Sequence, residues 1–178
     1  QMITEKIKKN LNFSFWVIAV SILLRVVGIY FFENANIDLN LSSANVNEWN
    51  ILFQNLVKYK SYTLYIFDGK LVPSVFMPPS YPFFLYLIKS ITLLEDNSFL
   101  HLIIFIQIIL SSLSVYLFFK INLNFFSLRL SFINSLVFSI FPINIYACGQ
   151  ISSVTLQIFF SLLFLYFLLL LIDNQKIK

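Results

Sequence analysis

The sequence predicts an all-α integral membrane protein with about four transmembrane helices and further juxtamembrane helices in a long first outer loop. Of its 178 residues, 59% are hydrophobic and only 11% are charged, whereas a soluble domain carries about 25% charged residues. The mean hydropathy is +0.84. The charged residues are clustered and leave four apolar windows of about 20 residues, each long enough to cross a hydrocarbon core of about 30 Å.

We expect residues 1–178 to form a single membrane domain. A cytoplasmic N-terminus at 1–12 precedes the first span at 13–32, and an outer loop covers 33–99. The remaining spans are expected at 100–119, 129–147 and 151–172. The lysines before the first span are also typical of a secretion signal. The apolar run after them is longer than a signal peptide requires, however, and no small-residue cleavage site follows it.

A fifth apolar segment, 83–94, decides the topology. It is about a dozen residues long and contains Lys89, so an interfacial or re-entrant helix is expected rather than a span. Cytoplasmic loops are enriched in Lys and Arg, and only the four-span arrangement places most basic residues on one side. Both termini are then cytoplasmic and Lys89 lies outside. The residues predicted to lie inside are Lys6, Lys8, Lys9, Lys120, Arg129, Lys176 and Lys178.

The outer loop contains local signals for a folded cap. Trp49, Leu52, Phe53 and Leu56 follow the i, i+3, i+4, i+7 spacing of an amphipathic helix that begins at Glu48. Asp68-Gly69-Lys70 predicts a turn between extended runs at 62–67 and 71–76. The prolines at 78, 79 and 82 favour an extended approach to a helix that starts near residue 81.

Polar residues inside the spans are expected to be mainly structural. Ser131, Ser135 and Ser139 recur every four residues, and Gln107, Ser111 and Ser114 form a similar ridge; both favour close helix packing. Arg25 is the exception, because a charge about twelve residues into a span costs at least about 2.5 kcal/mol unless it is compensated. Its side chain is expected either to snorkel to the outer headgroups or to face the bundle and meet a lipid phosphate.

Residue counts exclude several kinds of site. The single Cys148 allows no internal disulfide, and the single His101 cannot build a His-rich metal site. A net charge of +4, spread over lysine-flanked helices, suits a membrane protein and does not indicate nucleic-acid binding.

Three motifs stand in a recognisable order. Glu48-Trp49 opens the surface helix of the first outer loop, and Met-Pro-Pro-Ser-Tyr-Pro at 77–82 opens the next helix. Phe-Pro-Ile-Asn-Ile-Tyr at 141–146 is then followed by Gln-Ile-Ser-Ser at 150–153. This order, over most of the chain, resembles the membrane glycosyltransferases of the GT-C fold. The nearest relatives look like the lipid A aminoarabinose transferases and the protein O-mannosyltransferase-like enzymes of bacterial membranes.

The resemblance implies a multi-pass enzyme of the bacterial inner membrane. Such enzymes move a sugar from a polyprenyl-phosphate donor to a lipid or protein acceptor at the outer face. An outer-loop carboxylate acts as general base, worth about 10²–10⁴-fold in rate, or helps to hold a divalent cation near the phosphate. By this resemblance Glu48 is the catalytic residue, and no metal ligand is assigned. The implied substrate-binding residues are Arg25, Asn45, Asn47, Pro79, Tyr81 and Gln150.

Some positions depart from the family pattern. If the family's outer-loop aspartate aligns with Asn45 or Asn47, its carboxylate is missing, and Val154 stands where a second acid is often found. A non-catalytic or degenerate membrane subunit of the same fold is therefore one alternative, and a small lipid carrier is another. The resemblance also implies that the chain is the N-terminal portion of a longer enzyme. We expect residues 1–178 alone to insert into membranes without transferring sugar.

Overall fold

The computed structural model describes residues 2–34, 48–73, 77–92 and 94–176. Three helices in this part are long and apolar enough to cross a membrane: α1 (Met2–Asn34), α4 (Asp96–Asn122) and α7 (Val154–Lys176). The bent pair of α5 (Leu128–Ile140) and α6 (Pro142–Cys148) provides a fourth crossing if it counts as one span. The fold is predominantly helical with three to four candidate spans, and it is compatible with the predicted all-α membrane protein.

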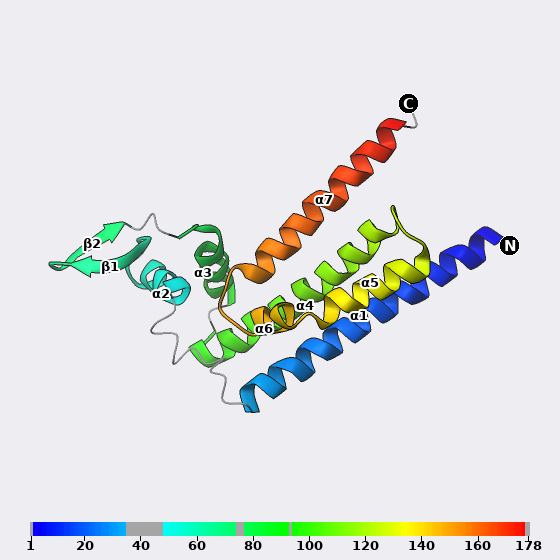
Figure 1. Cartoon of the computed structure of the whole chain (residues 1–178). Helices are drawn as coiled ribbons and strands as arrows, with labels where there is room; N and C mark the ends of the chain where they lie inside the picture. Colours follow the sequence, from blue (N-terminus) through cyan, green and yellow to red (C-terminus); the bar gives the residue numbers. More distant parts are fainter. Residues whose placement is uncertain (1, 35–47, 74–76, 93, 177–178) are drawn as a thin grey trace.

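Helices α1, α4 and α5 lie side by side and form the bundle (Figure 1). Their contact surfaces combine an apolar centre of Val17, Val115 and Phe119 with the predicted serine ridges. Ser131, Ser135 and Ser139 of α5 are all fully buried, so the small side chains do face the neighbouring helices, where they permit close backbone approach. Helix α7 packs on α4 but leans away from α1 and α5 toward its C-terminal end (Figure 1).

The first long loop forms a compact cap at the end of the bundle away from both termini (Figure 1). It contains α2 (Glu48–Tyr59), β1 (Thr63–Phe67), β2 (Lys70–Pro73) and α3 (Ser80–Thr92). The predicted surface helix and hairpin are present, although residues 74–76 of the second extended run lie outside the described residues. Helix α3 is not among the helices that could cross a membrane. The described start of α1 and the described end of α7 both lie away from the cap (Figure 1).

The hairpin turn follows from its two central residues. Asp68 and Gly69 have φ angles of 46° and 72°, and two positive φ values are the requirement of a type I′ turn, which Asp-Gly satisfies well. The strands pair antiparallel, with Phe67 opposite Lys70 and Ile66 opposite Leu71.

The contacts that join the cap to the bundle include an apolar cluster and an ion pair. Phe53 of α2, Tyr81 and Leu85 of α3, and Phe99 and Ile103 of α4 are buried together. At the edge, the Lys89 ammonium donates to the Asp96 carboxylate at 2.8 Å and to the Leu94 carbonyl at 2.6 Å. Because Asp96 is exposed, this pair adds at most about 1 kcal/mol. Apolar burial therefore holds the cap in place.

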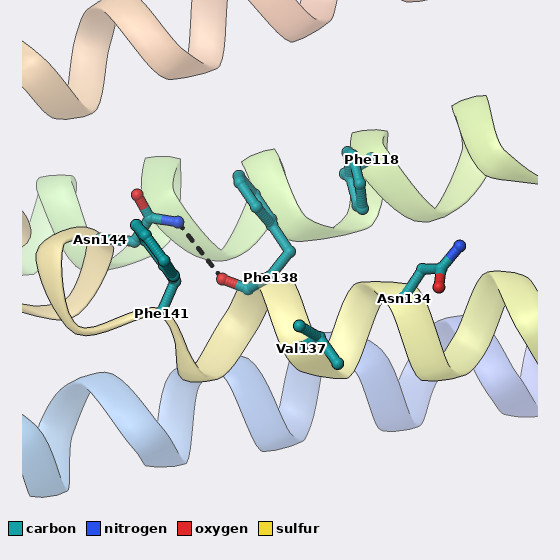
Figure 2. Close-up of a pocket in the computed structure, with 6 residues that line it drawn as sticks. All are labelled: Phe118, Asn134, Val137, Phe138, Phe141 and Asn144. Atoms are coloured by element: carbon teal, nitrogen blue, oxygen red, sulfur yellow. Dashed lines mark hydrogen bonds between the residues drawn. The ribbon is translucent and has the colours of Figure 1, made fainter.

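The third apolar window, expected as one helix over 129–147, is instead broken. Helices α5 and α6 meet at an angle of 57°, with Phe141 in an extended conformation between them. Pro142 is the cause, since it has no N–H to donate to the carbonyl of Phe138. The side chain of Asn144 donates to that carbonyl instead, at 3.2 Å (Figure 2). Sequence reading overlooked this Phe-Pro break because the window is uniformly apolar.

Candidate functional site

A pocket of about 380 Å³ lies where the cap meets the broken span; we call it the outer pocket, after the predicted outer loop that forms the cap. Its walls come from the start of α2, from α6, from the turn after α6 and from the first residue of α7. The pocket therefore joins the first outer loop to the segment that follows the third apolar window. Its lining residues are Trp49, Ile143, Tyr146, Ala147, Gln150, Ile151, Ser152 and Val154.

Trp49 is held at this position by the amphipathic pattern of α2. Leu52, Phe53 and Leu56 are buried, so this helix face is fixed against α3 and α4. The Trp49 indole meets the Tyr81 ring edge-to-face, with centroids 5.6 Å apart. Such aromatic pairs add about 0.5–1.5 kcal/mol beyond the area they bury. The indole is thus a fixed wall of the pocket.

Gln107 connects the cap to the opposite wall. The Tyr81 hydroxyl donates to Gln107 Oε1 at 3.1 Å, and Gln107 Nε2 donates to the carbonyls of Cys148 and Gln150 at 3.1 and 2.9 Å. Both the oxygen and the nitrogen of this amide are therefore hydrogen-bonded, and the side chain is fully buried. Burial also raises the pKa of the Tyr81 phenol, which keeps it neutral and able to donate. One side chain of α4 thereby fixes the turn that carries Gln150.

One lining residue, Gln150, carries a buried amide nitrogen, Nε2, that is not hydrogen-bonded within the described part of the chain. An unsatisfied buried donor costs about 1–3 kcal/mol. Ser152 adds a hydroxyl to the same lining, and Trp49 and Tyr146 add aromatic rings. Mostly apolar walls with a few convergent polar groups are typical of small-molecule sites.

The sequence-predicted site residues are distributed unevenly around this pocket. Gln150 lines it, and Tyr81 lies directly behind Trp49. Glu48 is half-buried in the first turn of α2, next to Trp49, but does not line the pocket. Pro79 is exposed just before α3, where its carbonyl accepts from the Phe83 amide at 3.0 Å. Asn45 and Asn47 lie outside the described residues.

Arg25 lies away from the pocket, inside the bundle. Its Nε donates to Ser111 Oγ at 2.7 Å, and its Nη1 donates to the Ser21 carbonyl at 3.0 Å and to Ser139 Oγ at 3.4 Å. The side chain has no exposed surface. Of the two expectations for Arg25, snorkelling does not describe this structure, and the bundle-facing orientation does. Contact with a lipid phosphate stays a prediction. The guanidinium cross-links α1, α4 and α5.

Three contributors to the site were missed by sequence reading. Trp49 was treated only as part of an apolar stripe, Tyr146 only as part of a motif, and Gln107 only as a packing residue. A usable signal existed for Gln107, because a lone amide in an apolar helix must satisfy several hydrogen bonds. No such signal identifies the backbone carbonyls that it contacts, since they lie about 40 positions away in sequence.

Metal binding and relatives add no further assignment. Within the described ranges, no group of three or more His, Cys, Asp or Glu residues is placed to hold a metal ion. Comparison with known proteins gives no match to a family model, to a curated protein or to a solved structure.

Proposed function

We propose that this chain is the N-terminal portion of a glycosyltransferase that uses a polyprenyl-phosphate-linked sugar and acts at the outer face of the bacterial inner membrane. The acceptor would be a lipid or a protein. One observation carries the proposal: Trp49 of the cap and Gln150 after the broken span line the same pocket. The pocket is thus built from the two loop segments whose motifs resemble the GT-C enzymes.

The chemistry of the pocket suits a sugar. The C–H groups of a pyranose ring pack on the electron-rich face of an aromatic ring, and Trp49 and Tyr146 offer two such rings. Sugar hydroxyls can pair with the polar lining residues Gln150 and Ser152. Because the pocket adjoins the ends of apolar helices, the hydrocarbon tail of a lipid-linked donor could stay in the bilayer while the sugar enters.

Glu48 supports a catalytic reading through its position. It precedes Trp49 in the first turn of α2 and does not line the pocket, so the proposal requires its carboxylate to reach the bound sugar or acceptor from beside the indole. In the full-length enzyme, Glu48→Gln should lower transfer at least about 100-fold, the low end for a general base, with expression unchanged. Glu95→Gln is the matched control, because that acid is exposed and outside the pocket. Near-normal turnover in Glu48→Gln would return Glu48 to the role of a helix-start acid.

Binding tests the pocket without requiring turnover. Tyr146→Ala should weaken binding of farnesyl-phosphate mannose and farnesyl-phosphate aminoarabinose to protein in nanodiscs by about tenfold, equivalent to about 1.4 kcal/mol. Tyr65→Ala removes an equally large ring from the exposed face of the hairpin and should leave affinity unchanged. Equal affinities for wild type and Tyr146→Ala would exclude this pocket as the sugar site.

A non-catalytic subunit of the same fold is the second candidate. It is favoured by one observation, namely that Glu48 does not line the pocket. Sugar-donor binding that depends on Tyr146, combined with full activity of Glu48→Gln in the assembled enzyme, would select this candidate.

A further inference from the structure

A second hollow of about 450 Å³ lies between α4 and α5, on a different face of α6 from the outer pocket. Figure 2 shows its lining side chains along α5 and the facing turns of α4. Four of the six are large and apolar, two are asparagines, and none is charged. The lining residues are Phe118, Asn134, Val137, Phe138, Phe141 and Asn144. We refer to this hollow as the α5 groove.

The break of the third apolar window creates the groove. Where α5 ends at Ile140, Phe141 turns outward and is half exposed. Phe138 stacks on Phe118 of α4 with centroids 4.6 Å apart and forms the floor. The amides of Asn144 and Asn134 donate to the Phe138 carbonyl and to Asn122 Oδ1, respectively, so both are anchored to the protein. The groove is therefore preformed and needs no rearrangement to admit a ligand.

The surroundings of the groove decide what chemistry can fill it. Helix α4 is an apolar span, and α5 is half of the broken one, so the groove faces hydrocarbon. Water is disfavoured in such a hollow, because apolar cavities stay dry and the hydrocarbon core contains no water. Another transmembrane helix is a poorer fit, because interfaces between membrane helices are enriched in small residues. The small residues of α5 are already turned inward, whereas Val137 and Phe141 form the outer rim.

We propose that the α5 groove binds one acyl chain of a bilayer phospholipid as a fixed, stoichiometric lipid. From Asn134 to Asn144 the groove covers ten residues, or at most about 15 Å of helix, which is half of a hydrocarbon core of about 30 Å. A single acyl chain of one leaflet matches this length.

The glycosyl donor is a poorer fit to the groove. The outer pocket uses Ile143, Tyr146 and Ala147 of α6, while the groove uses Asn144 and the preceding Phe141. The two hollows share no residue, and the stated positions lie on different faces of α6 at 100° per residue. A donor whose sugar fills the outer pocket would have to wrap around α6 to enter the groove. The proposal therefore does not depend on the glycosyltransferase assignment.

Two neighbouring positions on α5 allow a matched test. Val137 and Ile133 are 64% and 53% exposed and lie one turn apart, but only Val137 lines the groove. Protein reconstituted with palmitoyl-oleoyl-phosphatidylethanolamine is washed extensively in mild detergent, and retained phospholipid is counted by native mass spectrometry. Wild type and Ile133→Trp should retain one phospholipid per chain. In Val137→Trp the affinity should fall about tenfold, equivalent to about 1.4 kcal/mol, and the retained phospholipid should fall with it.

Equal retention in all three proteins, equal loss in both variants, or a wild type that retains no phospholipid would overturn the proposal. Retention of a polyprenyl lipid in place of phosphatidylethanolamine would also overturn it. A second experiment uses only the wild type, so its outcome does not depend on whether the variants fold. In wild type, phosphatidylethanolamine with a diazirine on its acyl chain should label peptides containing Phe138 and Phe141 saturably, at one adduct per chain. Unsaturable labelling spread over the exposed α7 would contradict a specific site.

Discussion

The outer pocket and the α5 groove lie on different faces of one short helix, α6, and differ in the hydrogen bonding of their polar side chains. In the outer pocket, Gln150 Nε2 is buried without a partner in the described residues. In the groove, the amides of Asn144 and Asn134 donate to protein acceptors. A pocket with the polar residues Gln150 and Ser152 among its walls suits a hydroxyl-bearing ligand, whereas a mostly apolar groove whose two amides are already hydrogen-bonded suits hydrocarbon. One helix break therefore produces two sites of different chemistry.

The largest effect is expected from Gln107→Leu, which should affect the outer pocket alone. It leaves the Tyr81 hydroxyl and two backbone carbonyls without their partner, and each unsatisfied buried group costs about 1–3 kcal/mol. We expect a loss of about 3 kcal/mol or more in unfolding free energy and no sugar-donor binding, with groove lipid retained. Ser114→Ala is the control for thermal unfolding. Ser114 is buried on the same helix, and its hydroxyl donates to the Leu110 carbonyl one turn earlier. Unchanged donor binding in Gln107→Leu would break the comparison.

Gly28→Ala should damage both sites together. A Cβ at Gly28 would overlap the Cγ2 methyl of Ile145 in α6, and overpacking of this kind costs about 1–3 kcal/mol. Because α6 separates the two hollows, both donor binding and lipid retention should fall. The double variant with Ile145→Ala removes the overlapping methyl and should recover most of the loss. Additive destabilisation in the double-mutant cycle would show that this contact does not fix α6.

Asn144→Ala should affect the groove more than the outer pocket. The Phe138 carbonyl loses its side-chain donor, and Pro142 cannot replace it, so a cost of about 1–2 kcal/mol is expected. Lipid retention should drop while donor affinity changes little. Thermal unfolding and native mass spectrometry of the same sample measure both quantities. A larger fall in donor affinity than in lipid retention would reverse the assignment.

The smallest effect concerns alkaline pH and Tyr81. Burial raises the pKa of this phenol in the folded protein above its unfolded value of about 10. Stability contributed by the neutral phenol is therefore fully present below about pH 10 and is lost as the pH rises further. The unfolding temperature of wild type should fall more steeply above about pH 10 than that of Tyr81→Phe. Parallel pH curves would show that Tyr81 does not ionise with this penalty.

Patterns local in sequence predicted most of the fold. The amphipathic spacing from Trp49 to Leu56, the Asp68-Gly69 turn and three of the four apolar windows depend on neighbouring residues, and they appear in the structure as predicted. The break at Pro142 was predictable in principle, since proline inside an apolar window interrupts the helical hydrogen bonds.

The site was harder to predict because its contacts are distant in sequence. Arg25 is 86 residues from Ser111 and 114 from Ser139, and no periodicity in one helix reveals which residues of another will face it. The role of Gln107 depends in the same way on backbone carbonyls exposed by a turn. Gln150 was reached only through a family resemblance, and Trp49 and Tyr146 became visible as pocket walls only when α2 and α6 were placed together.

The fluorescence of Trp49 tests the central claim, that the outer pocket receives the sugar of a lipid-linked donor. The chain has two tryptophans, and Trp16 lies exposed on α1, so Trp16→Phe leaves Trp49 as the single reporter. Titration of this variant in nanodiscs with farnesyl-phosphate mannose or farnesyl-phosphate aminoarabinose should change its emission saturably with at least one of the two. Farnesyl phosphate alone should leave the emission unchanged. Emission that responds to neither sugar donor, or equally to farnesyl phosphate, would contradict the account.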